Sequence, residues 1–287
     1  MQDFNFYRAG SVDEALKILK EKKGRVKLIS GGTDVLIDMR NGDLPGQTEL
    51  VLDISGLEEL KGLRVEEGMV HIAGATLLAE IAEDRQLRER CGVLAEAADS
   101  VGSQQIRNRG TIGGNIVTAA QCADTAPPLM VLDATVVLAS AEGSREVPIT
   151  EFFTGPKSTA VGPEELVVEI IFPLPAKSMR GTFEKLIRRE AVAKSRLGLC
   201  LLVDRQKDGT IGEARLSIGS SLPTHGRFPT VEKMLAGKKA DAKLLHEAGI
   251  EAGEYMVKIG GYRWSTDYKM PVVQSLTERC LKRVLEV

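Results

Sequence analysis

The sequence predicts an α+β protein of two domains, and three observations support this prediction. The chain has 287 residues, more than a single domain usually contains. Strands and helices alternate along its first part, whereas its last part predicts three strands followed by helices. The segment Pro173-Leu174-Pro175 separates the two patterns. We therefore expect one domain at residues 1–175 and a small α+β domain at residues 176–287.

The first sixty residues predict a strand–helix–strand unit. Ser11 and Glu14 make a capping-box pattern before a helix whose apolar residues share one face, and Gly24 is expected to end that helix. An apolar run at 26–29 predicts a buried strand. A short helix at 35–39 and a strand at 50–54 complete the unit.

The middle of the chain predicts a hairpin, three helices and two strands. Glu67-Gly68 is the turn of the hairpin. Thr76 is the expected N-cap of one helix, and two prolines occupy the first turn of another that begins near Asp124. The hairpin strands are expected at 63–66 and 69–72, a further helix at 93–100, and the other strands at 135–138 and 166–172.

The last part of the chain predicts a three-stranded antiparallel sheet covered by helices. Asp208-Gly209 is a typical turn pair between its second and third strands. The strands are expected at 182–187, 197–203 and 211–218, and the helices at 230–235, 241–256 and 266–285.

Composition and charge argue against several classes of protein. The formal net charge of −2 gives no reason to expect nucleic-acid binding. No apolar stretch approaches the roughly 20 residues that a membrane span needs, and the N-terminus is unlike a secretory signal. We therefore expect a cytoplasmic protein with no nucleic-acid partner and no membrane span.

The cysteines and histidines predict no metal site. The four cysteines lack a CxxC pair, and the three histidines have no HxxxH or HExxH spacing. Buried, reduced thiols are the favoured interpretation of the cysteines, and Cys122, two residues before Asp124, is expected to be a structural thiol.

Two glycine loops are the candidate functional feature. The first is Ser30-Gly31-Gly32-Thr33-Asp34, and the second is Thr111-Ile112-Gly113-Gly114-Asn115. Glycine allows positive φ and close approach of a phosphate, and consecutive N–H groups in such turns bind anions. Each loop alone could equally be a tight bend. The GxGxxG and GxxxxGK(S/T) motifs are both absent, which excludes two common nucleotide-binding folds.

The two loops together, in this order and at this spacing, resemble the FAD-binding subunits of the molybdenum hydroxylase family. Residues 29–36 resemble the family's first FAD loop, and residues 107–115 resemble the second. The resemblance covers nearly the whole chain and includes a C-terminal domain of the carbon monoxide dehydrogenase flavoprotein type. It continues through residues 124–129, 133–134, 152–157 and 164–166. The xanthine and nicotinate dehydrogenase FAD subunits are similar in these segments.

This resemblance implies a two-subdomain FAD-binding fold of the PCMH/vanillyl-alcohol-oxidase type, divided at about residues 1–57 and 58–175. It implies noncovalent FAD that receives electrons from [2Fe-2S] clusters on a small partner subunit. Those electrons would originate at the molybdopterin of a large partner subunit and pass to NAD+ or another acceptor. The complex would be a heterotrimer that could dimerise, and this chain would carry neither metal nor catalytic residues.

The resemblance also implies FAD contacts at individual positions. The loops would enclose the pyrophosphate, and Asp124 would accept bonds from cofactor hydroxyls, with a helix N-cap as its alternative role. Val101 stands where some relatives have a phenylalanine, so ring stacking there is in doubt. Lys185 is either an FAD contact or a surface lysine. The expected contacts are Ile29, Ser30, Gly31, Gly32, Thr33, Asp34, Val35, Val101, Thr111, Ile112, Gly113, Gly114, Asn115, Asp124, Val167 and Lys185.

Departures from the family pattern narrow the prediction. The cysteine-bearing inserted loop of the 4-hydroxybenzoyl-CoA reductases is missing, so no iron–sulfur cluster is expected here. Thr33-Asp34 stands where carbon monoxide dehydrogenases have His-Ser, which favours the xanthine or nicotinate type. Residues 188–194 are either a gate near the flavin or a solvated charge run. A self-sufficient flavin oxidase and a scaffold subunit without FAD are the alternative functions.

Overall fold

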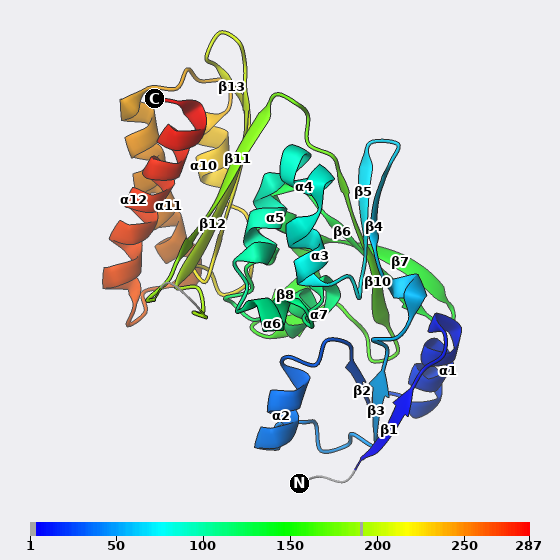
Figure 1. Ribbon diagram of the computed structural model, residues 1–287. Helices are drawn as coiled ribbons and strands as arrows, with labels where there is room; N and C mark the ends of the chain where they lie inside the picture. Colours follow the sequence, from blue (N-terminus) through cyan, green and yellow to red (C-terminus); the bar gives the residue numbers. More distant parts are fainter. Residues whose placement is uncertain (1–3, 190–191) are drawn as a thin grey trace.

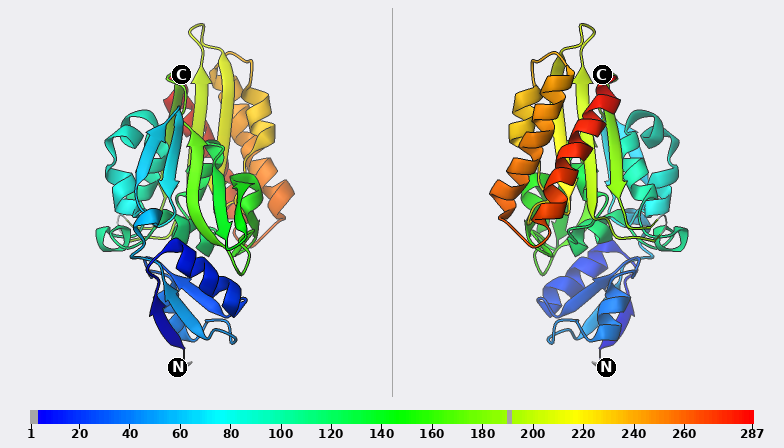
Figure 2. Two further views of the ribbon diagram at one scale, coloured as in Figure 1. Left: turned by 90° about the vertical axis from the view of Figure 1, so that its right-hand side faces the viewer. Right: turned by 90° about the vertical axis from the view of Figure 1, so that its left-hand side faces the viewer.

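The computed structural model describes residues 4–189 and 192–287, which form an N-terminal unit, a central part and a C-terminal domain (Figure 1). The N-terminal unit is a parallel sheet of order β1-β3-β2 with two helices, α1 (Val12–Lys22) and α2 (Val35–Asn41). Its strands are β1 (Asn5–Arg8), β2 (Val26–Ile29) and β3 (Leu50–Asp53). Both views of Figure 2 show this unit, in blue, below the rest of the molecule.

The predicted strand–helix–strand unit is confirmed, with small differences at the caps of α1. The Ser11 hydroxyl accepts the Glu14 N–H at 3.1 Å, but the Glu14 carboxylate accepts from Gly10 N–H instead of completing the capping box. Lys23, with φ 44°, takes the left-handed C-cap position, one residue before the expected Gly24.

The central part is built on an antiparallel sheet of order β4-β5-β10-β6-β7. The predicted hairpin is confirmed, and Glu67 (φ 50°) and Gly68 (φ 80°) are both left-handed, as a two-residue hairpin turn requires. The strands are β4 (Leu63–Glu66), β5 (Met69–Ala73), β6 (Thr135–Ser140), β7 (Gly143–Pro148) and β10 (Leu166–Pro173).

Short helices cover one face of this sheet. Thr76 is not the N-cap that the sequence predicted, because its hydroxyl donates to the Gly62 carbonyl at 2.8 Å and Leu77 takes the cap position. The helices are α3 (Leu78–Glu83), α4 (Arg85–Arg90), α5 (Gly92–Asp99), α6 (Gln104–Arg107), α7 (Ile112–Thr118), α8 (Ala126–Val131) and α9 (Ile149–Phe152). A one-turn 3-10 helix (Glu58–Leu60) and the small strands β8 (Phe153–Gly155) and β9 (Ser158–Thr159) complete this part.

The C-terminal domain is the predicted three-stranded antiparallel sheet with helices. Its order is β11-β12-β13. The strands are β11 (Met179–Leu186), β12 (Leu197–Arg205) and β13 (Ile211–Gly219), and the helices are α10 (Pro229–Leu235), α11 (Ala242–Gly260) and α12 (Thr266–Leu285). None of the helices in the described ranges is long and apolar enough to cross a membrane.

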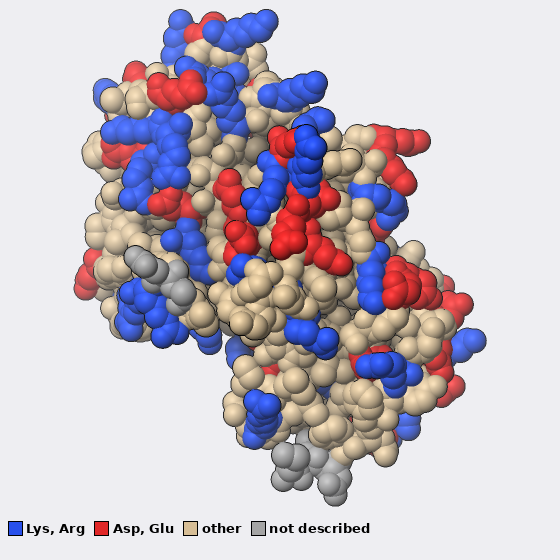
Figure 3. All heavy atoms as spheres, in the orientation of Figure 1, with Lys and Arg blue, Asp and Glu red and all other residues tan. Residues whose placement is uncertain are grey.

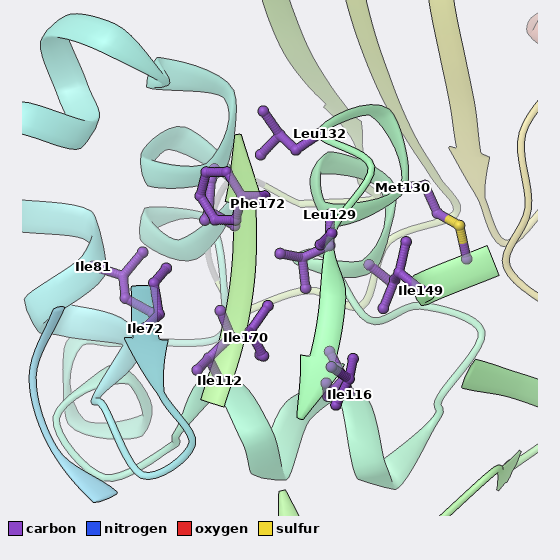
Figure 4. Close-up of a cluster of buried hydrophobic side chains, with 14 of the residues drawn as sticks. Ile72, Ile81, Ile112, Ile116, Leu129, Met130, Leu132, Ile149, Ile170 and Phe172 are labelled. Carbon is purple, nitrogen blue, oxygen red and sulfur yellow. The ribbon is translucent and has the colours of Figure 1, made fainter. Parts of the chain in front are cut away.

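Strand β12 joins the central part and the C-terminal domain because both of its faces are buried. Leu199 and Leu201 point into the core under α11 and α12, whereas Cys200 and Leu202 belong to the core of the central part. This explains the unbroken apolar run of the strand, since a strand covered on both faces has no solvent-facing positions. Figure 4 shows the central core, in which Ile72, Ile170 and Phe172 of the sheet meet helix residues such as Ile112.

Candidate functional site

A cavity of about 560 Å³ lies between the N-terminal unit and the central part, within the roughly 300–1,000 Å³ range of small-molecule pockets. Both glycine loops contribute to its wall. The predicted site residues that line it are Ser30, Gly31, Gly32, Thr33, Asp34, Val35, Val101, Thr111, Gly113, Gly114, Asn115, Asp124 and Val167. The fold therefore brings segments that are far apart in sequence to one cavity.

The first glycine loop presents backbone amides that have no protein partner. No N–H group from Ser30 to Val35 donates a hydrogen bond to any described residue. Gly32 has φ 74°, so the chain reverses within the loop and helix α2 starts beyond it. The Ser30 hydroxyl oxygen is buried and likewise unpaired among the described residues. An array of free amides around a left-handed residue is suited to an anion such as a phosphate.

The second glycine segment differs from the prediction, because it is the first turn of helix α7 and not an open loop. Thr111 is the N-cap, and its hydroxyl accepts the Gly114 N–H at 3.2 Å. The N–H groups of Ile112, Gly113 and Asn115 donate to the carbonyls of other residues, at 2.9 to 3.1 Å. These amides are therefore committed to the protein, and the segment forms a fixed wall.

The two glycine segments come together through backbone contact. A Cβ on Gly31 would lie 1.9 Å from the Arg109 carbonyl oxygen, just before the second segment. The Thr118 hydroxyl of α7 also donates to the Asp34 carboxylate at 3.3 Å. Gly31 is thus required for the approach of the N-terminal unit to α7, whatever ligand the cavity takes.

Gly74 is a cavity residue that the sequence analysis missed. Its Cβ would lie 2.2 Å from the Val167 carbonyl oxygen, and a Cβ on Gly113 would lie 2.5 Å from the Gly74 carbonyl oxygen. The backbones at Gly74, Gly113 and Val167 therefore lie in close contact and form a smooth part of the cavity wall. A glycine directly after the strand β5 is a signal of such close approach, and it could have been used.

A buried ion pair stands at the cavity wall. The Lys185 ammonium donates to the Asp124 carboxylate at 2.6 Å and to the Ser100 carbonyl at 2.7 Å, and the Ser195 hydroxyl donates to the other Asp124 oxygen. Burial raises the pKa of Asp124, while Lys185 and Ser195 oppose that rise. Asp124 is not a helix N-cap, because Thr125 takes that position. The C-terminal domain therefore holds this carboxylate in place.

Three predicted contacts do not line the cavity. Lys185 is neither a direct lining residue nor a surface lysine, because it lies behind Asp124. Ile112 is fully buried in the central core, as the packing of α7 on the sheet requires (Figure 4). Ile29 ends strand β2, where its carbonyl accepts the Ile54 N–H at 2.9 Å. The sequence alone could not show which residues of these segments face the cavity and which face the protein core.

The rim of the cavity includes Cys122 and the residues 192–194. Cys122 is half-buried, and Cys91, Cys200 and Cys280 are buried thiols. Residues 190–191 of the predicted gate lie outside the described residues, so the choice between a gate and a charge run stays open. No cluster of three potential metal ligands occurs within residues 4–189 and 192–287.

Comparison with known proteins identifies relatives over the whole chain. Residues 2–175 match the family model for the FAD-binding domain in molybdopterin dehydrogenase, and residues 182–284 match that for the CO dehydrogenase flavoprotein C-terminal domain. The chain is 31% identical to the nicotinate dehydrogenase FAD-subunit of Eubacterium barkeri, with 100% of this chain and 97% of the relative covered. It is 30% identical to a putative xanthine dehydrogenase FAD-binding subunit of Escherichia coli (strain K12), with 99% and 97% covered.

The fold is similar to that of a solved carbon monoxide dehydrogenase from Hydrogenophaga pseudoflava. The superposition has a TM-score of 0.91 at 28% identity and covers 99% of this chain and 97% of the other. A carbon monoxide dehydrogenase from Oligotropha carboxidovorans gives the same TM-score at 22% identity, which supports the fold alone.

Proposed function

The chain belongs to the family of FAD-binding subunits of molybdenum hydroxylases, and from this premise we propose that it carries noncovalent FAD as the electron-transfer subunit of such a complex. In the proposed complex, [2Fe-2S] clusters on a small partner subunit deliver electrons that originate at molybdopterin on a large one. The electrons leave through FAD to an acceptor such as NAD+. The names of relatives describe subunits and medium chains, which supports a heterotrimeric arrangement.

The observation that carries the proposal is the unpaired amide array of the first loop. The N–H groups from Ser30 to Val35 have no described partner, and the buried Ser30 hydroxyl has none either. A buried unpaired group such as the Ser30 hydroxyl is costly unless a ligand bonds it. A pyrophosphate fits this requirement, and the left-handed Gly32 gives the loop the conformation that leaves its amides unpaired.

The other walls suit the remaining parts of FAD. Asn115 uses its side-chain oxygen to accept the Thr125 hydroxyl at 2.7 Å, which leaves its NH2 group available to a ligand. The Asp124 carboxylate, held by Lys185, is placed to accept cofactor hydroxyls. Val101, Leu78 and Val167 give apolar surface for ring atoms. FAD itself would supply the redox chemistry, exchanging electrons with iron–sulfur clusters and with a two-electron acceptor.

The proposal has three further parts. The domain boundary is placed at residues 175/176, with the first domain divided near residue 57. The location is cytoplasmic, which is supported by the four free cysteines. The chain has no substrate-activating residues of its own, so hydroxylation belongs to the partner with molybdopterin.

Purification of the full chain with added FAD tests the proposed function. We expect a yellow protein with one flavin per chain, and acid precipitation should release all of that flavin as FAD. The same preparation should not hydroxylate any substrate until the partner subunits are added. A colourless protein that does not take up FAD would favour the scaffold alternative, and hydroxylation or oxidation of a substrate by the chain alone would favour the oxidase.

A further inference from the structure

Residues 119–124 lie between helices α7 and α8, outside any helix or strand. The left-handed Ala119 (φ 48°) turns the chain away from α7, and the Ala123 N–H donates to the Ala120 carbonyl at 2.9 Å. The members of this segment that line the cavity are Ala120, Cys122, Ala123 and Asp124. A segment without regular structure needs bonds from other elements to keep one conformation.

A loop of the C-terminal domain, residues 220–227, supplies such bonds just after strand β13. The His225 Nε2 atom donates to the Ala120 carbonyl at 2.9 Å. The N–H and the hydroxyl of Ser220 donate to the Gln121 carbonyl at 2.9 and 3.0 Å. The Gln121 side-chain amide donates in return to a carbonyl of the loop at 3.0 Å. Four hydrogen bonds therefore join this loop to two neighbouring residues of the segment.

His225 is a neutral donor held inside the protein. It is 8% exposed, and burial lowers its pKa, so the imidazole is uncharged at neutral pH. A carbonyl oxygen can only accept, so the proton of the neutral ring stands on Nε2. The centre of the ring lies 4.7 Å from that of Phe153 in the central part. His225 thus has two separable features, a donor that bonds the segment and a ring that packs beside Phe153.

The same loop is linked to Asp124, at the far end of the segment. The Ser220 hydroxyl lies 3.4 Å from the Ser195 carbonyl, and the Ser195 hydroxyl donates to Asp124. Figure 3 shows many charged side chains on the surface of the C-terminal domain, whereas the bonds to Ala120 and Gln121 use uncharged groups. Both ends of the segment are thus bonded to the C-terminal domain from within the fold.

The attachment of the C-terminal domain does not depend on Ser220 and His225 alone. Asp133, beyond the other end of α8, forms ion pairs with Arg227 at 2.5 Å and with Arg215 at 2.8 Å. Strand β12 also packs one of its faces into the core of the central part. Loss of a single bond to the segment should therefore leave the domain in place, and its consequence should appear in the segment itself.

From these observations, and resting on the proposed function, we infer that His225 and Ser220 are positioning residues for FAD. They hold residues 120–124 in the conformation in which this side of the cavity receives the cofactor. Neither is among the described residues that line the cavity, so both act through the carbonyls of Ala120 and Gln121. Without their bonds the segment samples other conformations, and the affinity for FAD falls with the fraction of chains that keep the competent one.

Two substitutions of His225 separate its donor from its ring. His225→Phe keeps a ring beside Phe153 but has no donor for Ala120, so it should bind FAD about tenfold more weakly, as one lost hydrogen bond predicts. His225→Gln keeps an N–H donor on a side chain of similar reach and loses the ring, so it should bind FAD within about twofold of the wild-type affinity. Fluorescence titration of the full chain with FAD measures both affinities.

Ser220→Ala gives a second, milder test with a matched control beside it. The variant keeps the N–H bond to Gln121 and loses the hydroxyl bond, so FAD binding should weaken about threefold. Ser221→Ala removes the neighbouring buried hydroxyl, which donates to the Ile218 carbonyl within the C-terminal domain. That control should bind FAD as the wild-type chain does. Asp133→Asn, which weakens the attachment beyond α8, should also keep the wild-type affinity.

Hydrogen exchange of the FAD-free chains reports on the segment without the cofactor. The amides of residues 119–124 should exchange about threefold faster or more in His225→Phe and Ser220→Ala than in the wild-type chain. They should exchange at wild-type rates in His225→Gln and Ser221→Ala. The affinity and the exchange rate should therefore change together across the variants.

Several results would overturn the inference. Wild-type FAD affinity in His225→Phe, or unchanged exchange of residues 119–124, would show that the bond to Ala120 does not position this side of the cavity. Equal losses of affinity in His225→Phe and His225→Gln would assign the effect to packing of the ring. Equal losses in Ser220→Ala and Ser221→Ala would assign it to general destabilisation. If the wild-type chain binds no FAD, the proposed function fails, while the exchange rates still decide whether the loop fixes the segment.

Discussion

The two glycine segments that line the cavity have similar sequences but differ in the hydrogen bonding of their backbone amides. In the first, the amides from Ser30 to Val35 have no described partner, and Gly32 is left-handed. In the second, the amides from Ile112 to Asn115 all bond within the protein, and the segment is helical. The first segment thus has backbone amides available to a ligand, whereas the amides of the second are already used within the protein.

This difference shows that glycine serves two separate purposes in one site. At Gly32 it permits a backbone conformation that exposes amides. At Gly31, Gly74 and Gly113 it removes a Cβ that would collide with a neighbouring carbonyl. We therefore expect substitutions at Gly32 to act mainly on cofactor affinity, and substitutions at Gly31, Gly74 and Gly113 to act on the stability of the fold.

Gly31→Val should have the largest effect, because Gly31 belongs to the contact between both segments. Its Cβ would meet the backbone of Arg109 at 1.9 Å, and a backbone atom cannot rotate away. We expect a stability loss of about 3 kcal/mol or more and no retained FAD. Thermal unfolding and the flavin-to-protein ratio measure both effects.

The matched control for this variant is Gly46→Ala, in the same unit, where an added Cβ meets nothing within 4 Å. It should keep wild-type FAD content and stability. If Gly31→Val also retained FAD, the two segments would not need to touch, and the comparison between them would lose its basis.

The next effect concerns the ion pair that fixes the cavity wall. Lys185→Met leaves the buried Asp124 carboxylate without its cation, which typically costs about 3–5 kcal/mol. Burial already raises the pKa of Asp124, and loss of Lys185 should raise it further. A carboxyl whose folded pKa is raised gives most stability below its unfolded pKa of about 3.9, and loses it as pH rises through the folded value.

The variant should therefore be closest to the wild type in stability below about pH 4, and fall further behind as the pH rises through the folded pKa of Asp124. Urea unfolding at several pH values measures this difference. Asp124→Asn/Lys185→Met, which removes both charges, should recover part of the loss. A deficit that does not change with pH would show that Lys185 acts through packing and not through the charge of Asp124.

Gly32→Ala and Gly113→Ala should separate the two purposes of glycine. Gly32→Ala forces a residue with a Cβ to adopt φ 74°, at about 1–2 kcal/mol, and disturbs the free amides. Gly113→Ala brings a Cβ within 2.5 Å of the Gly74 oxygen. We expect Gly32→Ala to lower FAD affinity about tenfold or more with a small change in melting temperature. Gly113→Ala should lower the melting temperature more and change FAD affinity less. If both variants changed FAD affinity and melting temperature to the same extent, glycine would not serve two separate purposes at these positions.

Much of this fold could be predicted from the sequence because its main elements have strong local signals. The antiparallel C-terminal sheet and the hairpin turn at Glu67-Gly68 follow from apolar runs and turn pairs. Strands β1 and β7 were missed because nearly all of their residues are exposed. They have no apolar alternation, and pairing with β3 and β6 holds them in place.

The site was predictable in its location and less so in its contacts. Glycine pairs and a resemblance indicated the two segments that line the cavity. The burial of Lys185 behind Asp124, and the contact of Gly74 with Val167, depend on segments that meet only in the folded chain. The use of the α7 amides within the protein likewise depends on the carbonyls of Thr76 and Gly74, which no local pattern reveals.

The smallest expected effect tests a single atom of the open loop. The buried Ser30 hydroxyl has no described partner, so Ser30→Ala should leave the FAD-free protein as stable as before or up to about 1 kcal/mol more stable. If a cofactor oxygen bonds this hydroxyl, the same variant should bind FAD about fivefold more weakly.

Thr277→Val is the control, because the Thr277 hydroxyl is also buried without a described partner but lies in the C-terminal core. It should change stability in the same direction and leave FAD affinity unchanged. FAD titration by fluorescence and urea unfolding of both variants give the comparison. If Ser30→Ala bound FAD like Thr277→Val, the Ser30 hydroxyl would be an ordinary unpaired group, and the ligand-binding role would belong to the loop amides alone.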